Sequence, residues 1–410
     1  MSPRLLLDIT RLMRRSGHAT PTGIDRVEMA YAHYLARHAG ERLTYTALHP
    51  GGWHVRLPRA AAESFLRETA LRWRGEPAHA LRAAGRLWLR LCLSAPRRAM
   101  AADPAAYLLL SHTNLERPAA VARALANEHA RLVCLVHDLI PLTHPEFARA
   151  GTSLAHRQRL QTVEALADLV VTNSGATLRS LIALLGPGQR PAHMLAVPLG
   201  VSLPAACSDA RAARPPYFVM LGTIEPRKNH VLLLQVWQRM LSMAGATPTP
   251  QLVIVGRNGW ENTHVMTILE RAPGLNGVVS LASGRSDREV AALLRGARAL
   301  LMPSFAEGFG LPVAEALALG VPVIASDLPA LRETGGGTPD YLDPMDGPAW
   351  LRAIRDYTPP DSPRRAAQLG RLAAWTAPTW DAHCGGVLDA IDTLLQGGAP
   401  RAAQEPHLAA

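Results

Sequence analysis

The sequence predicts an α/β protein with two doubly wound parallel sheets, and three observations support this. The chain has 410 residues, which is enough for two or three domains. It is 48% hydrophobic and 19% charged, so wholesale disorder is excluded. Short, continuous apolar runs alternate with helical segments, as in parallel sheets whose two faces are both covered by helices.

The second half shows this alternation most clearly. Its apolar runs predict strands at 217–221, 252–255, 278–281, 299–302 and 321–325. The segments between them predict helices at 231–240, 289–297 and 312–319. In such sheets ligands bind beyond the carboxyl ends of the strands, so the loops that follow strands are where chemistry is expected.

The first half follows the same order less regularly. Strands are predicted at 5–9, 106–110, 132–136, 169–172 and 194–198, and helices at 26–37, 118–128 and 153–167. Residues 58–103 are rich in Arg, Ala and Leu and are expected to be helical. A linker is predicted at 202–216, where Pro, Ala and Ser cluster. The expected domains are therefore 1–205 and 206–375, followed by a helix at 376–398 and a flexible tail at 399–410.

Charge is divided unevenly along the chain. The net charge is +10, but residues 1–198 hold 25 Arg against 14 Asp and Glu, whereas residues 199–410 hold 18 basic against 19 acidic residues. A basic chain suggests nucleic-acid binding, which we weighed as an alternative function. Stacking aromatics are scarce at 5% and the second half is neutral, so no nucleic-acid partner is expected. Of the 43 basic residues only Lys228 is a lysine.

Several sites and segments are excluded by what the sequence lacks. Four cysteines lie far apart with no CxxC pair, so neither a zinc ribbon nor a disulfide framework is expected. The apolar run at the start is too short for a signal peptide, and no run of about 18 apolar residues predicts a transmembrane helix. A cytoplasmic protein is expected. The sequence contains neither GxxxxGK[ST] nor Asp-x-Asp, so P-loop chemistry is disfavoured and no metal site is predicted.

The loop after the strand at 217–221 has the residues of an anion site. Gly222 permits a tight turn, and Arg227 and Lys228 lie where a helix is about to begin. An isolated Arg-Lys pair is more often a solvated turn. A chain that uses Arg at every other basic position, however, has its single Lys here. This favours a diphosphate site, because Arg offers a planar fork and Lys a compact charge.

The loop after the strand at 299–302 brings two carboxylates and two glycines. Glu307 lies in a glycine-rich turn with Gly310, and Glu315 is expected in the opening turn of the next helix. A carboxylate at the position of Glu315 could serve only to complement the positive end of the helix dipole. That role does not account for the presence of Glu307 or of the glycines. We expect one carboxylate to face the reacting centre and the other to accept from ribose hydroxyls.

Two loops of the first half are weaker candidates. The strand at 132–136 delivers His137 and Asp138 at its carboxyl end, although a lone histidine there is more often structural. Gly23 opens the helix after the first strand and suits close approach of a phosphate or sugar. Asp25 beside it has the simpler explanation of a helix cap.

Taken together, these motifs resemble family 4 of the retaining glycosyltransferases with the GT-B fold. Glu307 to Glu315 resembles the E-x7-E signature, and Gly222 to Asn229 resembles the donor-diphosphate loop. The resemblance covers nearly the whole chain and is thinnest at 58–103. It implies two Rossmann-like domains facing across a cleft, an acceptor-side N-terminal domain, a nucleotide-sugar domain, and a C-terminal helix packed back on the first domain.

The resemblance also implies the roles of individual residues. Arg227 and Lys228 would bind the donor diphosphate, Glu315 would hold the ribose, and Glu307 would contact the donor sugar. The remaining positions would line the donor site: His137 at the sugar, Gly23 and Gly222 near the diphosphate, and the backbone amides of Phe309, Gly310 and Leu311 at the phosphates. The implied enzyme is a hexosyltransferase that needs no metal or other cofactor.

The Glu-Pro-Arg-Lys-Asn-His stretch resembles bacterial mannosyltransferases that use GDP-mannose. The implied function is retaining transfer of mannose to a glycan or lipid-linked acceptor in surface-polysaccharide synthesis, for example of lipopolysaccharide. A GT-B epimerase or phosphorylase and an inactive scaffold remain alternatives.

The basic excess has a second interpretation as a membrane contact. Residues 71–100 carry seven Arg against one acid, Glu76, with Trp73, Trp88 and several leucines interleaved. This composition suits a basic amphipathic segment on an anionic leaflet, and equally a solvated helix over the core of the first domain. The first interpretation predicts peripheral association with the inner leaflet of the plasma membrane.

Overall fold

The computed structural model describes residues 3–96, 103–186, 191–204, 216–243 and 249–400. The chain divides into two compact units. Unit 1 comprises Met1–Thr143, Ala150–Gly200 and Thr379–Ala410, and unit 2 comprises His144–Arg149 and Val201–Pro378. Most of the linker predicted at 202–216 and most of the predicted tail lie outside the described residues.

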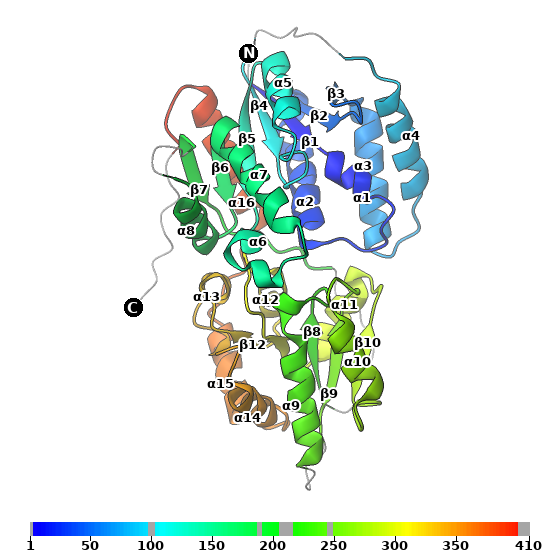
Figure 1. Cartoon of the computed structure of the whole chain (residues 1–410), viewed down its shortest axis with the longest axis vertical. Helices are drawn as coiled ribbons and strands as arrows, with labels where there is room; N and C mark the ends of the chain where they lie inside the picture. Colours follow the sequence, from blue (N-terminus) through cyan, green and yellow to red (C-terminus); the bar gives the residue numbers. More distant parts are fainter. Residues whose placement is uncertain (1–2, 97–102, 187–190, 205–215, 244–248, 401–410) are drawn as a thin grey trace. The chain divides into compact units, whose positions relative to one another are not determined.

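Unit 1 contains a seven-stranded sheet in the order β3-β2-β1-β4-β5-β6-β7 (Figure 1). The strands are β1 (Arg4–Asp8), β2 (Leu43–Leu48), β3 (His54–Arg56), β4 (Ala105–Leu109), β5 (Ala130–Val136), β6 (Ala167–Thr172) and β7 (His193–Ala196). Its helices are α1 (Thr10–Arg15), α2 (Gly23–His38), α3 (Arg59–Trp73), α4 (Ala80–Cys92), α5 (Pro118–Glu128), α6 (Ile140–Thr143), α7 (Thr152–Leu166), α8 (Gly175–Leu184) and α16 (Trp380–Leu395).

Only one pair of strands in this sheet is antiparallel. β3 runs against β2 at the edge, with Ala47 opposite Val55, and the other pairs are parallel. The last helix, α16, belongs to unit 1 although it follows unit 2 in sequence. Tyr31 of α2 bonds His383 of α16 over 2.8 Å, so the end of the chain is held in this unit by a buried polar contact.

Unit 2 contains a six-stranded, wholly parallel sheet in the order β10-β9-β8-β11-β12-β13. The strands are β8 (Tyr217–Leu221), β9 (Gln251–Val255), β10 (Val279–Ala282), β11 (Leu300–Met302), β12 (Val323–Ser326) and β13 (Asp340–Leu342). The helices are α9 (His230–Ser242), α10 (Thr263–Arg271), α11 (Asp287–Gly296), α12 (Leu311–Ala318), α13 (Pro329–Gly335), α14 (Gly347–Tyr357) and α15 (Pro363–Leu372).

The strands of unit 2 are buried on both faces, which explains their continuous apolar runs. On one face Phe218 and Met220 pack with Trp237 of α9 and Trp350 of α14. The alternate residues of the same strands, such as Val219, pack on the other face with the residues of α11 and α12. Successive side chains of a strand point to opposite faces, so each strand supplies two cores.

The strand order of unit 2 places the candidate loops side by side. The order is that of the Rossmann fold, in which the first and fourth strands are neighbours where the order reverses. Here these strands are β8 and β11, paired through Val219 and Leu300. The loops that carry Lys228 and Glu307 therefore leave the sheet at one edge, at the point where this fold binds ligands.

Where the structure describes them, residues 58–103 form the helices α3 and α4, as predicted, with a non-helical turn at 74–79 between them, but the two tryptophans do not lie on an outer face. Trp73 ends α3 and is 5% exposed. The indole N–H of Trp88 donates to the carbonyl oxygen of Met13 over 3.2 Å. Arg97 and Arg98 lie outside the described residues. Within the described ranges, every helix is too short or too polar to cross a membrane.

Candidate active site

The loop after β8 is shaped around the side chain of Lys228. Gly222 follows β8 with φ +146°, a conformation that favours glycine. A Cβ there would lie 3.1 Å from Cε of Lys228. The lysine stem therefore occupies the space that the missing side chain of Gly222 leaves open, and Lys228 is only 6% exposed.

Asn229 joins the loops that follow β8 and β11. It sits after the short 3-10 turn Pro226–Lys228 in the left-handed conformation, with φ +57°. Its side-chain amide donates to the carbonyl oxygens of Pro303 over 3.1 Å and of Pro344 over 3.0 Å. The backbone N–H of Phe305 donates to the carbonyl oxygen of Arg227 over 2.9 Å. These bonds fix the two loops against each other.

Four charged side chains meet between these loops. Nζ of Lys228 lies 2.6 Å from Oε1 of Glu307, and Nη1 of Arg227 lies 2.8 Å from Oε2 of the same carboxylate. On its other edge, Arg227 places Nη2 2.6 Å from Oε1 of Glu225. Two cations and two carboxylates thus alternate in a cluster that is almost wholly buried.

Burial and pairing act against each other at these groups. Burial alone would raise the pKa of Glu307, but Arg227 and Lys228 outweigh it and lower this pKa to about 2. Burial lowers the pKa of Lys228, against the opposing effect of Glu307. Burial raises the pKa of Glu225 although Arg227 and Lys228 oppose the shift. Glu307 is thus the firmly ionised member of the cluster.

The helix after β11 begins earlier than predicted. α12 starts at Leu311, so Glu315 is its fifth residue and lies in the second turn, not in the opening turn. Gly310 is the N-cap in the left-handed conformation, with φ +95°. Glycine fits this position because it tolerates the left-handed conformation and because a Cβ there would collide with the side chain of Leu331.

The start of α12 offers donors to an anion. Within the described residues, the backbone amides of Phe309, Gly310 and Leu311 have no protein acceptor, as expected before the first turn of a helix. Phe309 is held by Thr334, whose hydroxyl donates to its carbonyl oxygen over 2.5 Å. Three consecutive N–H groups at a helix N-terminus form a general anion-binding arrangement.

His137 lies directly after β5 in unit 1 and is buried. Its Nε2 bonds the carbonyl oxygen of Leu110 over 2.8 Å, and because that oxygen only accepts, Nε2 carries the proton. Burial lowers the pKa of His137 to about 4. At neutral pH the ring is therefore uncharged, and Nδ1 is its acceptor. The adjacent amide of Asn173 donates to the carbonyl oxygen of His137 over 2.9 Å and fixes the backbone.

Gly23 is exposed and is the first residue of α2, which begins three residues before the predicted start at Arg26. The earlier start comes from a capping box: the Thr22 hydroxyl accepts from the amide of Asp25, and Asp25 accepts from the amide of Thr22 over 2.8 Å. Arg11 and Arg15 also pair with the Asp25 carboxylate. Asp25 therefore caps the helix as the N3 partner of Thr22, which agrees with the simpler explanation.

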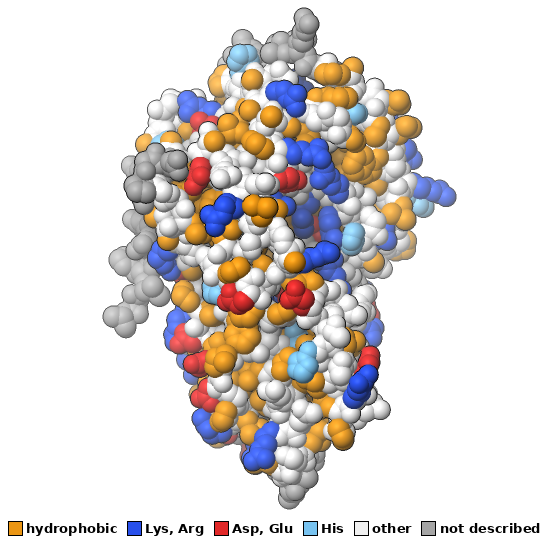
Figure 2. Space-filling view, in the orientation of Figure 1, with side chains coloured by type: hydrophobic (Ala, Val, Ile, Leu, Met, Phe, Trp, Pro, Cys, Tyr) orange, Lys and Arg blue, Asp and Glu red, His pale blue; other side chains and the backbone are white. Residues whose placement is uncertain are grey.

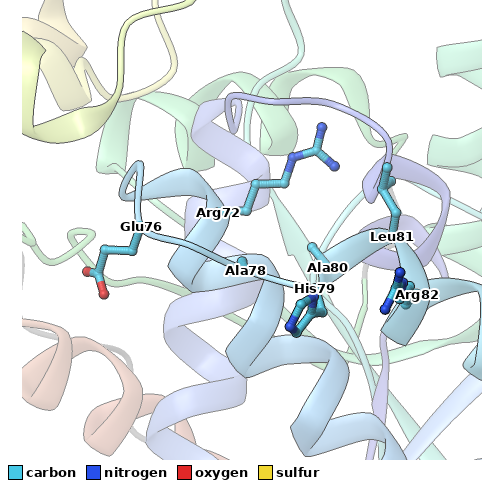
Figure 3. A pocket seen from close by; sticks show the side chains of 7 residues that line it. All are labelled: Arg72, Glu76, Ala78, His79, Ala80, Leu81 and Arg82. Atoms are coloured by element: carbon cyan, nitrogen blue, oxygen red, sulfur yellow. The ribbon is translucent and has the colours of Figure 1, made fainter.

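A separate hollow of about 330 Å³ lies at the start of α4 in unit 1. Figure 3 shows its lining, which includes the basic side chains Arg72, His79 and Arg82 and the acidic side chain Glu76. Leu81 of α4 lines it and is 60% exposed; further along, Leu89 of α4 and its C-cap residue Leu93 are 61% and 77% exposed. None of the sequence-predicted donor residues lines it.

Two of the residues that build the unit 2 site had no predicted role. Glu225 and Asn229 lie within the motif from Gly222 to Asn229, but their residue types and spacing predict no function for either. An Asn directly after a short basic turn is a signal for the left-handed conformation, because Asn tolerates it. The contact between Glu225 and Arg227 could not be predicted from residue spacing, because it depends on the conformation of the turn between them.

The arrangement in unit 2 suits a diphosphate at the edge of a Rossmann-like sheet. Arg227 and Lys228 supply positive charge beside the open amides of α12, and Glu307 supplies an ionised carboxylate at the same point. A buried pair of this kind stabilises negative charge more strongly than a solvated pair does. Fold and site therefore define an enzyme that handles a nucleotide-linked group.

Comparisons with known proteins agree with this. Residues 208–336 match the family model described as "Glycosyl transferases group 1". The chain is 30% identical over 267 residues to O-antigen chain mannosyltransferase B of Escherichia coli, covering 61% of this chain and 67% of that one. It is 30% identical over 216 residues to the serotype-specific mannosyltransferase WbdA of Escherichia coli, covering 48% of this chain but 26% of that longer protein.

A solved structure shows the same fold at low identity. HepE of Anabaena, crystallised in complex with UDP, has a TM-score of 0.62 and 15% identity, covering 96% of this chain and all of that one. The predicted α/β architecture is confirmed, and the fold is GT-B. The chain belongs to the group 1 glycosyltransferases and is a hexosyltransferase.

Proposed function

We propose that this glycosyltransferase transfers mannose from GDP-mannose, with retention of configuration, to a glycan or lipid-linked acceptor in bacterial surface-polysaccharide synthesis. The observation that carries the proposal is the buried cluster in which Arg227 and Lys228 meet Glu307 at the Rossmann switch point of unit 2. Support for the sugar and the pathway comes from relatives named as O-antigen mannosyltransferases.

The chemistry follows from the charges of this cluster. Cleavage of the sugar–phosphate bond leaves negative charge on the departing diphosphate and oxocarbenium character on the sugar. Arg227, Lys228 and the open amides of α12 stabilise the departing diphosphate, which lowers the barrier because these donors are already in place. The acceptor hydroxyl attacks from the face that the diphosphate leaves and gives its proton to the departing phosphate oxygen, so the configuration is retained.

The remaining residues bind and orient the donor in this proposal. Glu315, in the second turn of α12, accepts from the ribose hydroxyls, and Glu307 contacts the donor sugar while it stays paired with the two cations. Gly222 keeps the loop close to the phosphates. We propose that His137 and Gly23 also bind the donor. Arg227 and Lys228 take the place of a divalent ion, so we propose that no metal is required.

The donor is tested by binding. Purified protein is titrated with GDP-mannose, GDP-glucose, UDP-glucose and UDP-N-acetylglucosamine, and the shift in unfolding temperature and the heat of binding are measured. We expect the largest shift with GDP-mannose. A preference for a UDP-sugar would contradict the proposed donor and leave the diphosphate site standing, whereas no binding of any nucleotide sugar would contradict both. Addition of EDTA should leave binding and turnover unchanged.

We also propose peripheral association with the cytoplasmic leaflet, through part of residues 71–100. The outer strip of α4 carries Leu81, Leu89 and Leu93 beside a row of Arg82, Arg86 and Arg90, all exposed. Within the described residues no acidic side chain pairs with these three arginines. Figure 2 shows hydrophobic and basic side chains intermixed along the edge where Figure 1 places α4. An anionic lipid surface matches both properties.

Replacing the three arginines of this strip with glutamine should weaken binding to anionic vesicles. Each basic residue at an anionic surface contributes about 1 kcal/mol, so we expect about a 100-fold weaker partition of the Arg82→Gln, Arg86→Gln, Arg90→Gln variant. The measurement is flotation with phosphatidylcholine vesicles containing or lacking phosphatidylglycerol.

The control removes the same charge elsewhere in unit 1, through Arg67→Gln, Arg131→Gln and Arg157→Gln, all at exposed sites outside α4. This control variant should bind anionic vesicles, as measured by flotation, almost as strongly as the wild type does. Equal loss in both variants would mean that net charge, not the α4 strip, drives binding. Absence of vesicle binding by the wild type would overturn the membrane proposal.

A further inference from the structure

We infer that Glu225 is a positioning residue that couples binding of the donor diphosphate to uptake of one proton. This inference rests on the proposed donor site of unit 2 and deepens it. Oε1 of Glu225 accepts from Nε of Arg227 over 2.9 Å and lies 2.6 Å from Nη2 of the same guanidinium. It therefore holds one whole edge of the guanidinium.

The opposite side of Arg227 is held as well. Nη1 donates to the carbonyl oxygen of Ala306 over 2.8 Å and lies 2.8 Å from Oε2 of Glu307. The backbone adds a further constraint, because the amide of Lys228 donates to the carbonyl oxygen of Glu225 over 3.1 Å. A diphosphate that approaches Arg227 thus meets a guanidinium that two carboxylates already engage.

The charges of the cluster balance only while the site holds no anion. Arg227 and Lys228 carry two positive charges, and Glu225 and Glu307 carry two negative charges when both are ionised. A nucleotide-sugar diphosphate adds two further negative charges. Like charges in a buried site repel strongly, and such repulsion favours protonation of one carboxylate.

Glu225 is the carboxylate that takes the proton. Glu307 contacts both cations, which lower its pKa to about 2, so it stays ionised. Among the described residues, the Glu225 carboxylate pairs with Arg227 alone, and burial already raises its pKa. The charged groups around Glu225 are Arg227, Lys228 and Glu307, and the nearby His230 is neutral because burial lowers its pKa to about 4. An arriving diphosphate raises the pKa of Glu225 further, and the proton comes from solvent.

The consequence is a pH dependence with a defined sign. If binding raises the pKa of Glu225, affinity for the diphosphate falls as pH rises through the titration of this group. Glu225→Gln cannot titrate and lacks this component. We expect the affinities of wild type and variant to converge as pH falls towards 4.5, the ordinary value for Glu, and the variant to bind about tenfold more tightly at about pH 8.5, as for a pKa shift of about one unit.

The experiment is calorimetric titration with GDP, and with UDP in parallel, across this pH range in two buffers of different ionisation heat. The difference between the two buffers counts the protons taken up. Wild type should take up more protons than Glu225→Gln, and Glu225→Asp should retain the uptake. Glu270→Gln, at an exposed carboxylate on α10, is the control with the same change in net charge. The nucleotide releases or takes up the same protons with every variant, so the difference in proton uptake between variants does not contain the titration of the nucleotide.

The outcomes separate this inference from the proposed function. Tight nucleotide binding with equal pH profiles and equal proton uptake in wild type and Glu225→Gln would overturn the role of Glu225 and leave the donor site intact. Binding of UDP but not GDP would overturn the proposed donor while still testing Glu225. If neither nucleotide binds the folded wild type, the donor site is wrong and the inference falls with it.

Discussion

Replacing Lys228 with alanine should lower the turnover of sugar transfer by about 10²–10³-fold, the usual cost of removing a group that stabilises developing negative charge. The ammonium lies 2.6 Å from Glu307 and fills the space beside Gly222, so its charge is fixed at the point where the diphosphate would leave. The measurement is kcat with GDP-mannose and extracted acceptor lipids. The fold should persist, because Arg227 still pairs with Glu307.

Two further variants make this prediction specific. Lys228→Arg retains the charge but replaces a compact ammonium with a longer, planar guanidinium. We therefore expect it to restore at most part of the turnover that Lys228→Ala loses. Arg352→Ala removes an exposed positive charge of α14 in the same unit and should leave kcat unchanged. Wild-type turnover by folded Lys228→Ala protein would show that Lys228 does not act on the leaving group.

Replacing Glu307 with glutamine should also lower kcat by about 10²–10³-fold, while binding of the nucleotide diphosphate persists or strengthens. The carboxylate is the anion that both cations engage in this structure. Without its charge, Arg227 and Lys228 are more available to phosphate, whereas the contact to the donor sugar is lost. The split between kcat and nucleotide affinity, measured by steady-state kinetics and calorimetry, separates this role from general loss of the site.

The same variant has a predicted effect on acid stability. The pKa of Glu307 is lowered to about 2 in the folded state, against an ordinary value of 4.5. A depressed pKa contributes stability above about pH 4.5, and this contribution is lost as pH falls towards about 2. A shift of this size corresponds to about 3 kcal/mol. Between pH 6 and pH 3, wild type should therefore lose more unfolding free energy than Glu307→Gln, as measured by urea denaturation.

The Glu270→Gln variant serves as the control for both measurements, because it removes an exposed carboxylate from the same unit. It should match wild type in turnover and in acid sensitivity. Full activity in Glu307→Gln would remove Glu307 from the reaction. Equal acid sensitivity in Glu307→Gln and wild type would mean that the buried pair does not set the pH response.

The parallel sheets were predictable because their strands are buried on both faces. Phe218 and Val219 face different cores, so neither face leaves a polar position to interrupt the apolar run. The short antiparallel strand β3 was not predicted, since its three residues carry too little pattern. Helix starts were also misplaced: α2 begins at its Thr22 cap and α12 at Gly310, and both positions are fixed by local bonds or contacts.

The candidate site was predictable in its residues but not in its pairing. Strand order brings the loops after β8 and β11 together, so Lys228 and Glu307 follow from the fold class. The contact of Glu225 with Arg227 depends on the turn between them, and residue spacing does not define that turn. Similarly, the composition of residues 71–100 did not show that Trp73 faces inward while Leu89 faces outward, because that depends on how α3 and α4 pack.

Release of GDP from GDP-mannose is the measurement that tests the central claim most directly. Wild type, Lys228→Ala and Glu307→Gln are incubated with GDP-mannose and lipid-linked acceptors, and GDP and the anomeric configuration of the transferred mannose are followed over time. We predict GDP release with retention by wild type and about 10²–10³-fold slower release by both variants. Release at equal rates in all three proteins, or a product of inverted configuration, would contradict the account.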